Sequence, residues 1–535
     1  MEILGESKME MRNSKFLNTF DAEKLRRKRE EGLIELRKQK RNQQVSRKRA
    51  LQQEGGKKVE EPLVKCYEFF EFDLSLISKE LAEQCPELVK IELQNAERLQ
   101  ILIEHIEALE EIMALLHPIQ TLRKILSCDG TPPLQFIMNS GISSKLISLL
   151  SCQYLPLQTE SMWCVLNLAT GPSHIVKMLM DQDVIEQLKA VLTSNNPELL
   201  ELCVWCIGNL AGDSVDTRDK LTELVPQLTE LIKKVSIDKW KNIIWALSNL
   251  CRGKPLPERE ITQQILSIVP TILRINDEDS LADCCWALSY ISDGDNQRIQ
   301  DIIDLGILET LIQILGKDSE KVTIPCLRTL GNIVTGNEDQ TQKVLNLGFV
   351  DRIATFLISK KVSIKREALW TLSNITAGSD EQINLVLSHP CVISAVECLK
   401  DPDFEIKKEA LWTISNATHA KSPSLVLKVI ELGAFPLLCD ILDMKDSKIL
   451  LVVLEAINNL LRAGNAAFSS DQEVKNNEVA LKFDEIGGLS KMEELQEHPN
   501  TKIYKKVIEI MDEHYGLIEV TDENEPPQPQ RFSFN

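Results

Sequence analysis

The chain has 535 residues, of which 43% are apolar, and a formal net charge of −19. It exceeds the roughly 250–300 residues at which a single hydrophobic core stops growing, so several domains or one elongated array are expected. The first residues, MEILGESKMEMR, mix charges and lack the apolar segment of a secretory signal. No uninterrupted apolar run approaches the roughly 18 residues of a membrane span, so we expect a soluble protein.

Residue types that carry chemistry do not gather in any known catalytic or metal-binding pattern. The 14 cysteines lack the spacing of a disulfide framework and indicate reduced, intracellular core thiols. Cys203 and Cys206 form a C-x-x-C without a second pair, which favours core packing over metal or redox chemistry, as for Cys284 and Cys285. The 7 His are dispersed, and nucleotide-binding and hydrolase motifs are missing. We therefore expect no enzyme activity, no cofactor and no metal site.

The N-terminal arm is basic and the rest of the chain is acidic. Residues 12–49 hold 14 Lys or Arg against 5 Asp or Glu, a charge of +9. Because the first 11 residues carry −2 and the whole chain −19, the chain from Ala50 onward carries −26. This division favours binding of the arm to its own acidic body, with nucleic-acid binding as the alternative.

The arm also shows helical spacing. Leu25, Leu33 and Leu36 follow a possible N-cap at Asp21, and such a basic helix needs a partner to hold it. The tetrad SRKR, Ser46–Arg49, stands apart in a polar linker, which would let it lie in a groove while the helix binds elsewhere. Residues 66–117 predict one or two added amphipathic helices, which we interpret as a cap for the array that follows.

A motif of Trp and Asn four residues apart recurs through the acidic body. Its successive intervals are 42, 40, 41, 42, 42, 42 and 43 residues, the period of armadillo and HEAT repeats, each of two or three stacked helices. The copies are Trp163/Asn167, Trp205/Asn209, Trp245/Asn249, Trp286/Tyr290, Arg328/Asn332, Trp370/Asn374, Trp412/Asn416 and Glu455/Asn459. The sequence predicts an all-α solenoid.

Glycines punctuate the repeats in two places. Gly171, Gly212, Gly253, Gly294, Gly336 and Gly378 follow the motif by three or four residues, where a left-handed C′ glycine would end the helix. Gly141, Gly306, Gly348 and Gly433 precede the next apolar segment and suit a tight turn between shorter helices.

Residues four apart share one helix face, so each Trp lies beside its Asn. One interpretation is that Trp packs between repeats and Asn caps a turn. The second interpretation is an exposed ladder of Trp and Asn side chains, and the recurrence of the motif at a fixed phase favours it. In such a ladder, Asn pairs with a peptide backbone and the indoles leave slots for the aliphatic stems of Lys or Arg. Acidic residues near the motifs fit a basic, extended ligand: Asp213, Asp279, Asp283, Asp293, Glu367 and Glu409. Tyr290 and Arg328 interrupt the ladder and divide it into two patches.

The phrases LRRKRE, IELRK, SRKR, VWCIGNLAGD, CWALSYISDG, LRTLGNIVTG and ALWTLSNITAG together resemble the importin alpha family of nuclear import adaptors. The resemblance implies an armadillo-repeat, right-handed superhelical solenoid with a basic N-terminal arm. It implies an importin-beta-binding arm at 1–60 with an autoinhibitory tetrad at 46–49, a linker and added helix region at 61–117, about ten armadillo repeats at 118–515, and an acidic, disordered tail at 516–535.

By the same resemblance, basic nuclear localisation signals would bind in two concave sites. The major site would comprise Trp163, Asn167, Thr170, Gly171, Trp205, Asn209, Asp213, Asn242, Trp245 and Asn249. The minor site would comprise Arg328, Asn332, Val334, Thr335, Thr341, Glu367, Trp370, Asn374, Glu409, Trp412 and Asn416. Val176 and Leu202 stand where the family usually has Thr and Gln, which implies altered signal preference.

The family also implies the partners. Importin beta would bind Arg26, Arg27, Arg29, Arg37 and Lys38, and would free the major site from the tetrad residues Arg47, Lys48 and Arg49. A CAS-type export receptor with Ran-GTP would act in the nucleus, so the protein would shuttle through nuclear pores between cytoplasm and nucleus. No membrane insertion and no direct nucleic-acid role are expected. The rival hypothesis is a general armadillo scaffold that binds acidic or mixed partners through the same concave face. Such a scaffold would show no preference for Lys/Arg peptides, and its basic arm would contact nucleic acid or membrane.

Overall fold

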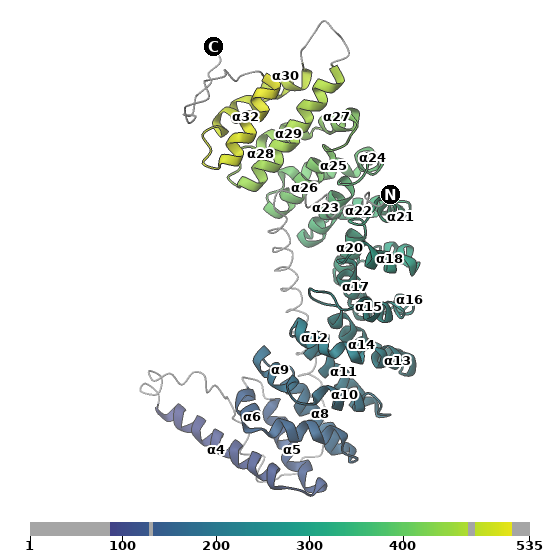
Figure 1. The fold of residues 1–535 in the computed structure, drawn as a ribbon, viewed down its shortest axis with the longest axis vertical. Coiled ribbons are helices and arrows are strands. Elements are labelled where there is room, and N and C mark those ends of the chain that lie inside the picture. Colours follow the sequence, from purple (N-terminus) through teal and green to yellow (C-terminus); the bar gives the residue numbers. More distant parts are fainter. Residues whose placement is uncertain (1–85, 128–131, 469–476, 516–535) are drawn as a thin grey trace, which may run out of the picture. The chain divides into compact units, whose positions relative to one another are not determined.

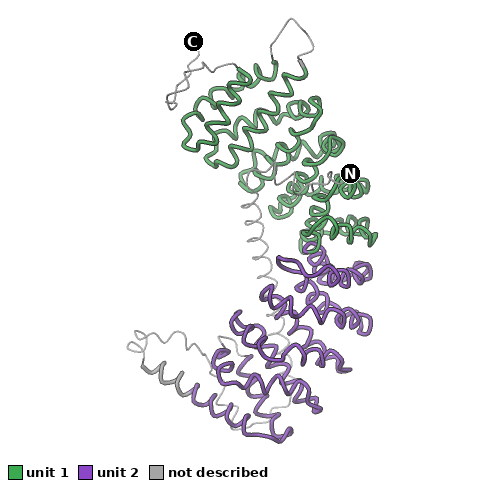
Figure 2. Tube along the Cα trace, viewed as in Figure 1, with its two compact units in different colours: residues 1–19, 291–535 green, residues 20–290 purple. Residues whose placement is uncertain are grey.

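The computed structural model describes residues 86–127, 132–468 and 477–515, and every regular element in these ranges is helical (Figure 1). The chain divides into two compact units (Figure 2). We call described residues up to Tyr290 the N-terminal unit and those from Ile291 the C-terminal unit, and the boundary falls inside α17, Glu278–Ser292. The predicted basic arm, its tetrad and the acidic tail lie outside the described residues.

The N-terminal unit is a succession of long and short helices. Its elements before α17 are α4 (Pro86–Ala108), α5 (Ile112–Leu126), α6 (Leu134–Ser140), α7 (Ile142–Ser148), η3 (Leu149–Ser151), α8 (Leu155–Leu168), α9 (Ser173–Met180), α10 (Val184–Val191), α11 (Pro197–Ala211), α12 (Val215–Leu221), η4 (Thr222–Leu224), α13 (Val225–Lys234), α14 (Ile237–Leu250), α15 (Arg259–Leu266) and α16 (Val269–Ile272).

The C-terminal unit repeats the same order. Its elements after α17 are α18 (Asn296–Asp304), α19 (Leu308–Ile314), α20 (Glu320–Ile333), α21 (Glu338–Leu345), α22 (Phe349–Leu357), α23 (Val362–Thr376), α24 (Asp380–Ser388), α25 (Cys391–Glu397), η5 (Cys398–Lys400), α26 (Phe404–Ala417), α27 (Pro423–Glu431), α28 (Ala434–Ile441), α29 (Ser447–Phe468), α30 (Glu478–Glu485), α31 (Gly488–Leu495) and α32 (Thr501–Tyr515).

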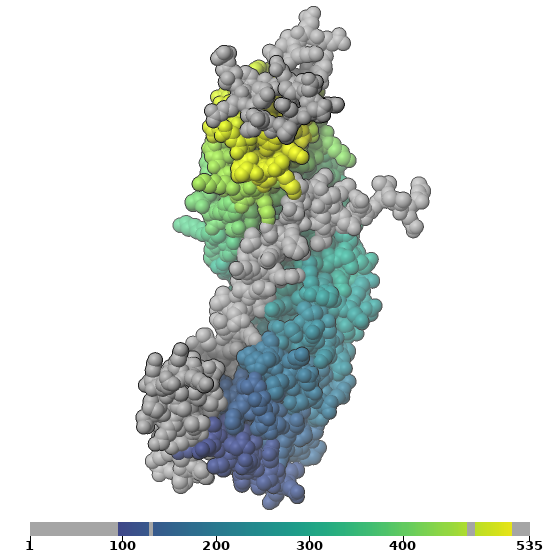
Figure 3. All heavy atoms as spheres, turned by 60° about the vertical axis from the view of Figure 1, so that its left-hand side comes forward, coloured from purple at the N-terminus to yellow at the C-terminus, as the bar shows by residue number. Residues whose placement is uncertain are grey.

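Like helices stack on like helices. Within the N-terminal unit the long helices α5, α8, α11 and α14 pack in succession, and in the C-terminal unit α20, α23, α26, α29 and α32 do so. Short helices also pack on their counterparts one repeat away, as α24 does on α27 and α22 on α25. Within each unit, the colours of the space-filling view change steadily along the stack, so repeats that are consecutive in the chain are neighbours in space (Figure 3). This nearest-neighbour packing is the organisation of a solenoid.

The helix α4 occupies the place expected of a cap. It packs on α5 and α7 and buries Leu99, Ile103 and Ile106. Its last carbonyls are held by Lys145, whose Nζ donates to the oxygens of Ile106 at 2.7 Å and Leu109 at 2.8 Å. A helix thus precedes the stack over Pro86–Ala108, within the segment 66–117 for which one or two added amphipathic helices are predicted.

The two classes of glycine behave differently. Gly141, Gly306, Gly348 and Gly433 have φ of +67° to +85°, which confirms the tight turns between the short helices. Among the glycines that follow the motif, we compare Gly171, Gly212, Gly253, Gly336 and Gly378. Gly253 alone of this set has a positive φ, so the prediction of a left-handed C′ glycine is wrong for the other four.

Close approach explains two of these exceptions. A Cβ on Gly336 would lie 2.3 Å from Gln340 Oε1, and one on Gly378 would lie 2.0 Å from Gln382 Oε1. Each glutamine completes a capping box at the start of the next helix and donates to a backbone oxygen one repeat earlier, at Asn296 and Glu338. The missing side chains of Gly336 and Gly378 make room for this cap.

Among the described helices, α29 is long and apolar enough to cross a membrane, by length and composition alone. The bent pair formed by α24 and the segment Cys391–Lys400 would be a second candidate if the pair were counted as one span. The candidate stretch Ser447–Ala467 is 61% buried inside the protein. It contacts α26, α27, α28, α30 and α32, as expected of a core helix.

Candidate functional site

The recurring motif lies on the long helix of each repeat. Trp163, Trp205 and Trp245 stand on α8, α11 and α14 of the N-terminal unit, and Trp370 and Trp412 on α23 and α26 of the C-terminal unit. Because these helices pack in succession within each unit, equivalent residues recur along one layer, at the roughly 8–10 Å separation of packed helices. All predicted major-site residues fall in the N-terminal unit, and all predicted minor-site residues fall in the C-terminal unit.

Six of the motif asparagines tie their long helix to the preceding one. The Nδ2 of Asn249 donates to the carbonyl oxygen of Gly208 at 2.8 Å, and the same bond joins Asn374 to Gly331 at 3.0 Å and Asn416 to Ser373 at 2.8 Å. Elsewhere the acceptor is a hydroxyl, as for Asn167 on Ser127, Asn332 on Ser292 and Asn459 on Thr418. The asparagines thus serve the stack and do not cap turns.

Two asparagines of the set retain an unsatisfied polar atom. Asn209 is 3% exposed, and its Nδ2 finds no hydrogen-bond acceptor in the part of the chain that the structure describes. Asn374 is 2% exposed, and its Oδ1 finds no donor within the same ranges. A buried polar group without a partner costs about 1–3 kcal/mol, so each atom calls for a ligand. One of these two asparagines lies in each predicted site.

The indoles lie against the preceding long helix. A Cβ built on Gly208 would meet Trp245 Cζ3 at 2.2 Å, and one on Gly331 would meet Trp370 Cζ3 at 2.4 Å. The ring therefore covers backbone that has no side chain. Packing between repeats, the alternative to the exposed ladder, describes this side of the Trp245 and Trp370 rings.

The predicted exposure of the ladder is wrong for the N-terminal unit. Trp163, Trp205 and Trp245 are 5%, 3% and 3% exposed, respectively. Contact with the neighbouring long helix accounts for part of this burial, as Trp245 shows. In the C-terminal unit Trp370 and Trp412 are partly exposed, as the ladder requires.

Acidic residues accompany the motif in both units. In the N-terminal unit, Asp213 is partly exposed after α11 and accepts a 2.8 Å hydrogen bond from Ser173 Oγ. In the C-terminal unit, the guanidinium of Arg328 contacts both carboxylate oxygens of Glu367, at 2.5 Å and 3.4 Å. Glu409, three residues before Trp412, is buried at 7% exposure. The position three residues before each C-terminal indole is thus anionic.

Hydroxyl groups fix the ends of the long helices beside these residues. Thr170 Oγ1 donates to the oxygen of Asn167, and Thr335 Oγ1 does the same to Asn332. Thr341 bonds to the oxygens of Val334 and Asn337. The threonines in the predicted sites therefore orient backbone, and the side chain of Val334 is buried.

The interruption of the ladder at Tyr290 has a local explanation. Tyr290 takes the place of the motif asparagine on α17 and stacks on Trp286, with ring centroids 5.9 Å apart. The two rings are 4% and 5% exposed. Here the motif position is filled by aromatic packing.

The residues that depart from the family pattern are buried. Val176 and Leu202 are 0% and 3% exposed, on α9 and α11.

The C-x-x-C thiols of Cys203 and Cys206 are both fully buried, which confirms the core-packing interpretation. Burial raises the pKa of each of these thiols well above its ordinary value, as it does for Cys284. These cysteines are kept neutral and act as small core residues.

A network beside the predicted major site was not predicted from the sequence. Glu201 Oε2 accepts from Lys239 Nζ at 2.9 Å, and its Oε1 accepts from Asn242 Nδ2 at 3.1 Å. Asn242 was predicted as a site residue, but its partner Glu201 stands 41 residues earlier on the preceding long helix. The repeat period of about 41 residues is the feature of the sequence that could have paired Glu201 with Asn242.

Comparisons with known proteins support the repeat architecture and the arm. The family model of the importin beta binding domain matches residues 12–103, the armadillo/beta-catenin-like repeat matches 295–335, 337–377 and 379–419, and the atypical Arm repeat matches 477–529. Importin subunit alpha-2 of Arabidopsis thaliana is 40% identical over 544 residues, covering 100% of this chain and 97% of the relative. The chain belongs to the importin alpha family.

Other relatives agree with this membership. Importin subunit alpha-B of Dictyostelium discoideum is 38% identical, covering 99% of this chain and 98% of the relative. Among solved structures, an engineered protein matches with a TM-score of 0.69 at 20% identity, covering 77% of this chain and 98% of its own, which supports the fold. As an importin alpha family member, the protein is a nuclear import adaptor that links cargo to importin beta. The predicted all-α armadillo fold is confirmed.

Proposed function

We propose that the two motif sets are the signal-binding sites of this adaptor. Trp163, Asn167, Thr170, Gly171, Trp205, Asn209, Asp213, Asn242, Trp245 and Asn249 form the major site for Lys/Arg-rich nuclear localisation signals. Arg328, Asn332, Val334, Thr335, Thr341, Glu367, Trp370, Asn374, Glu409, Trp412 and Asn416 form the minor site. The observation that carries the proposal is the unsatisfied buried amide atom in each set, on Asn209 and Asn374.

An extended peptide satisfies both kinds of atom. Its carbonyl accepts from Asn209 Nδ2 and its N–H donates to Asn374 Oδ1, independent of peptide sequence. The side chains then supply specificity. Partly exposed indoles at Trp370 and Trp412 attract a cationic stem by about 0.5–2 kcal/mol at each ring. Asp213 and Glu409 provide the negative charge near the slots, and Glu367 is already paired with Arg328.

We further propose that the arm regulates the major site. The tetrad residues Arg47, Lys48 and Arg49 compete with cargo in the unloaded protein, and importin beta withdraws them by binding Arg26, Arg27, Arg29, Arg37 and Lys38. The charge division supports this proposal, because residues 12–49 carry +9 and the chain from Ala50 onward carries −26.

The remaining family properties complete the proposal. A CAS-type export receptor with Ran-GTP returns the protein from the nucleus, so it shuttles between cytoplasm and nucleus. Its role is that of a binding protein and not of an enzyme.

A peptide titration tests the sites and the autoinhibition separately. We expect a basic nuclear-signal peptide to bind a variant lacking residues 1–60 more tightly than the full-length protein, and Asp213→Lys to abolish major-site binding in that variant. Each titration is run at two salt concentrations, because salt screens exposed charge pairs. Equal affinity of the two proteins would remove the autoinhibition. Indifference to Asp213→Lys would remove the assigned site.

A further inference from the structure

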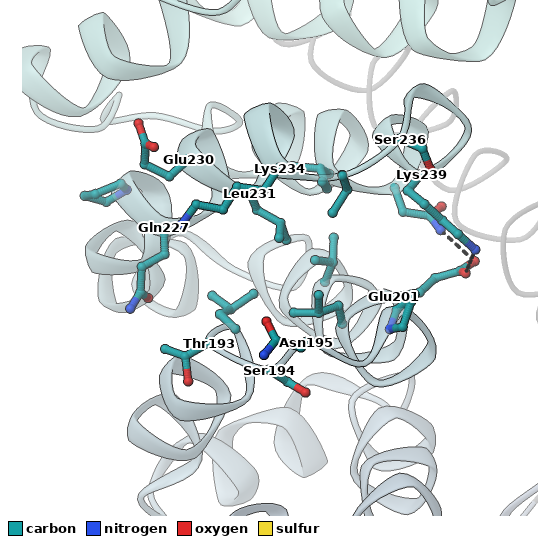
Figure 4. Close-up of a pocket in the computed structure, with 18 residues that line it drawn as sticks. Thr193, Ser194, Asn195, Glu201, Gln227, Glu230, Leu231, Lys234, Ser236 and Lys239 are labelled. Carbon is teal, nitrogen blue, oxygen red and sulfur yellow. Dashed lines mark hydrogen bonds and ion pairs between the residues drawn. The ribbon is translucent and has the colours of Figure 1, made fainter. Parts of the chain in front are cut away.

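A pocket of about 790 Å³ lies between two successive repeats of the N-terminal unit (Figure 4). It is bordered by the turn from α10 to α11 and by α13 and α14. Its apolar lining includes Leu200, Val204, Leu231 and Ile243, each at most 8% exposed. This volume lies within the roughly 300–1,000 Å³ range of ligand-binding pockets.

The pocket adjoins the proposed major site. Asn242 belongs to that site and lines the pocket, and it bonds to Glu201, which also lines the pocket. Glu201 and Lys239 mark one end, and Gln227 and Glu230 mark the other (Figure 4). Glu201 and Asn242 each lie about one helical turn before the motif tryptophan of their own helix. A peptide in the major site therefore passes close to the end formed by Glu201.

The charges of the pocket differ from those of the proposed signal slots. Glu201 is engaged by Lys239 and Asn242, and Glu230 is engaged by Lys233, so both carboxylates already have cationic or amide partners. Lys234, in contrast, is exposed and forms no ion pair among the residues that the structure describes, and its charge adds to that of Lys233 in lowering the pKa of Glu230. The pocket offers a Lys or Arg side chain no unpaired carboxylate.

A polar atom in the lining also lacks a partner. Gln227 Oε1 is buried and accepts no hydrogen bond within the described ranges. An N–H group that enters the pocket satisfies it, as a backbone amide does. The lining thus combines an apolar surface, one acceptor without a donor in the described ranges and one exposed cation.

We propose that this pocket takes an apolar side chain, Leu or Phe, that flanks the basic run of a bound signal, with a neighbouring Asp or Glu of the cargo at Lys234. This inference rests on the proposed major site and adds a second element to cargo recognition. Two contiguous surfaces of opposite chemistry then select a basic run joined to an apolar and acidic flank.

The test is a titration of the full-length protein with matched peptides. One peptide carries the basic run with an Ala-Ala flank, and two others carry Phe-Asp on the N-terminal or the C-terminal side of the same run. We expect one of the Phe-Asp peptides to bind about tenfold more tightly than the Ala-Ala peptide, as burial of one aromatic side chain provides. Equal affinity of all three peptides would overturn the inference.

Three variants assign the gain to this pocket. Asn195→Trp, at an exposed lining position, fills the pocket and should abolish the gain while binding of the Ala-Ala peptide stays unchanged. Lys234→Glu should remove the part of the gain that depends on Asp, about threefold. Lys360→Trp, in the exposed turn between α22 and α23, is the matched control and should leave every affinity unchanged.

The outcomes separate this inference from the function on which it rests. A gain that persists in Asn195→Trp would show that the flank binds elsewhere and would overturn the pocket assignment. Failure of the Ala-Ala peptide to bind the full-length protein and the variant lacking residues 1–60 would instead remove the major site itself.

Discussion

Gly208→Ala is the substitution that probes the packing of the major site most directly. Gly208 lies within α11, and its carbonyl accepts the hydrogen bond from Asn249. An added Cβ would lie 2.2 Å from Cζ3 and 2.6 Å from Cε3 of Trp245, an indole that is 3% exposed. The rigid ring must shift by about 1.5 Å to restore van der Waals separation.

Two effects of opposite sign set the change in stability. Replacing a helical Gly by Ala favours folding by about 1 kcal/mol, and overpacking a filled site costs about 1–3 kcal/mol. We therefore expect the free energy of unfolding to fall by about 0–2 kcal/mol. Affinity for a basic peptide should fall by a larger relative amount, about tenfold, because the displaced indole loses its place against the cationic stem.

Urea denaturation measures the stability change, and peptide titration of the variant lacking residues 1–60 measures the affinity. Ser373→Ala is the matched control, because Ser373 precedes the motif asparagine in the same way and already carries a Cβ. It should change the affinity by less than about twofold. A Gly208→Ala protein with unchanged affinity, or with Trp245 unmoved in its crystal structure, would refute this account of the indole's position.

Two further predictions concern the C-terminal unit. Arg328→Met removes the guanidinium, 4% exposed, that pairs with Glu367, and urea denaturation should show a loss of about 2–4 kcal/mol in the free energy of unfolding. The control is Arg462→Met, whose side chain is 47% exposed and whose loss should cost less than about 1 kcal/mol. Equal losses in the two variants would contradict the role of burial. Burial lowers the pKa of His514, whose Nε2 contacts Asn458 Oδ1 at 2.8 Å, so its stabilising contribution is complete above the ordinary His pKa and is lost as pH falls from about 6.5 toward the lowered value. His514→Gln should weaken this pH dependence in denaturation curves between pH 7.5 and 5, and identical slopes for the two proteins would argue against it.

The repeat architecture could be predicted from the sequence because it depends on residues close together in the chain. The motif period and the turn glycines at Gly141, Gly306, Gly348 and Gly433 are local signals, and the structure confirms both. A helix before the first repeat also follows from local amphipathic spacing, and α4 lies within the predicted segment.

The details of the site depend on contacts across one repeat, which a single sequence does not specify. Nothing local to Gly208 shows that an indole 37 residues later covers it, or that Asn249 bonds to its carbonyl. For the same reason the exposure of Trp163, Trp205 and Trp245 was predicted wrongly. The pocket beside Asn242 arises from the spacing of α10, α11, α13 and α14, and no motif marks it.

The asparagine bonds between adjacent long helices have a consequence for how such an array evolves. The segment of about 42 residues that holds α23 carries both halves of the joint, because Asn374 reaches back to Gly331 and the Ser373 carbonyl receives the amide of Asn416. A whole unit copied in register therefore arrives with its couplings complete. Deletion of part of a unit leaves one helix without its anchor, which favours gain and loss of entire repeats over changes in their length.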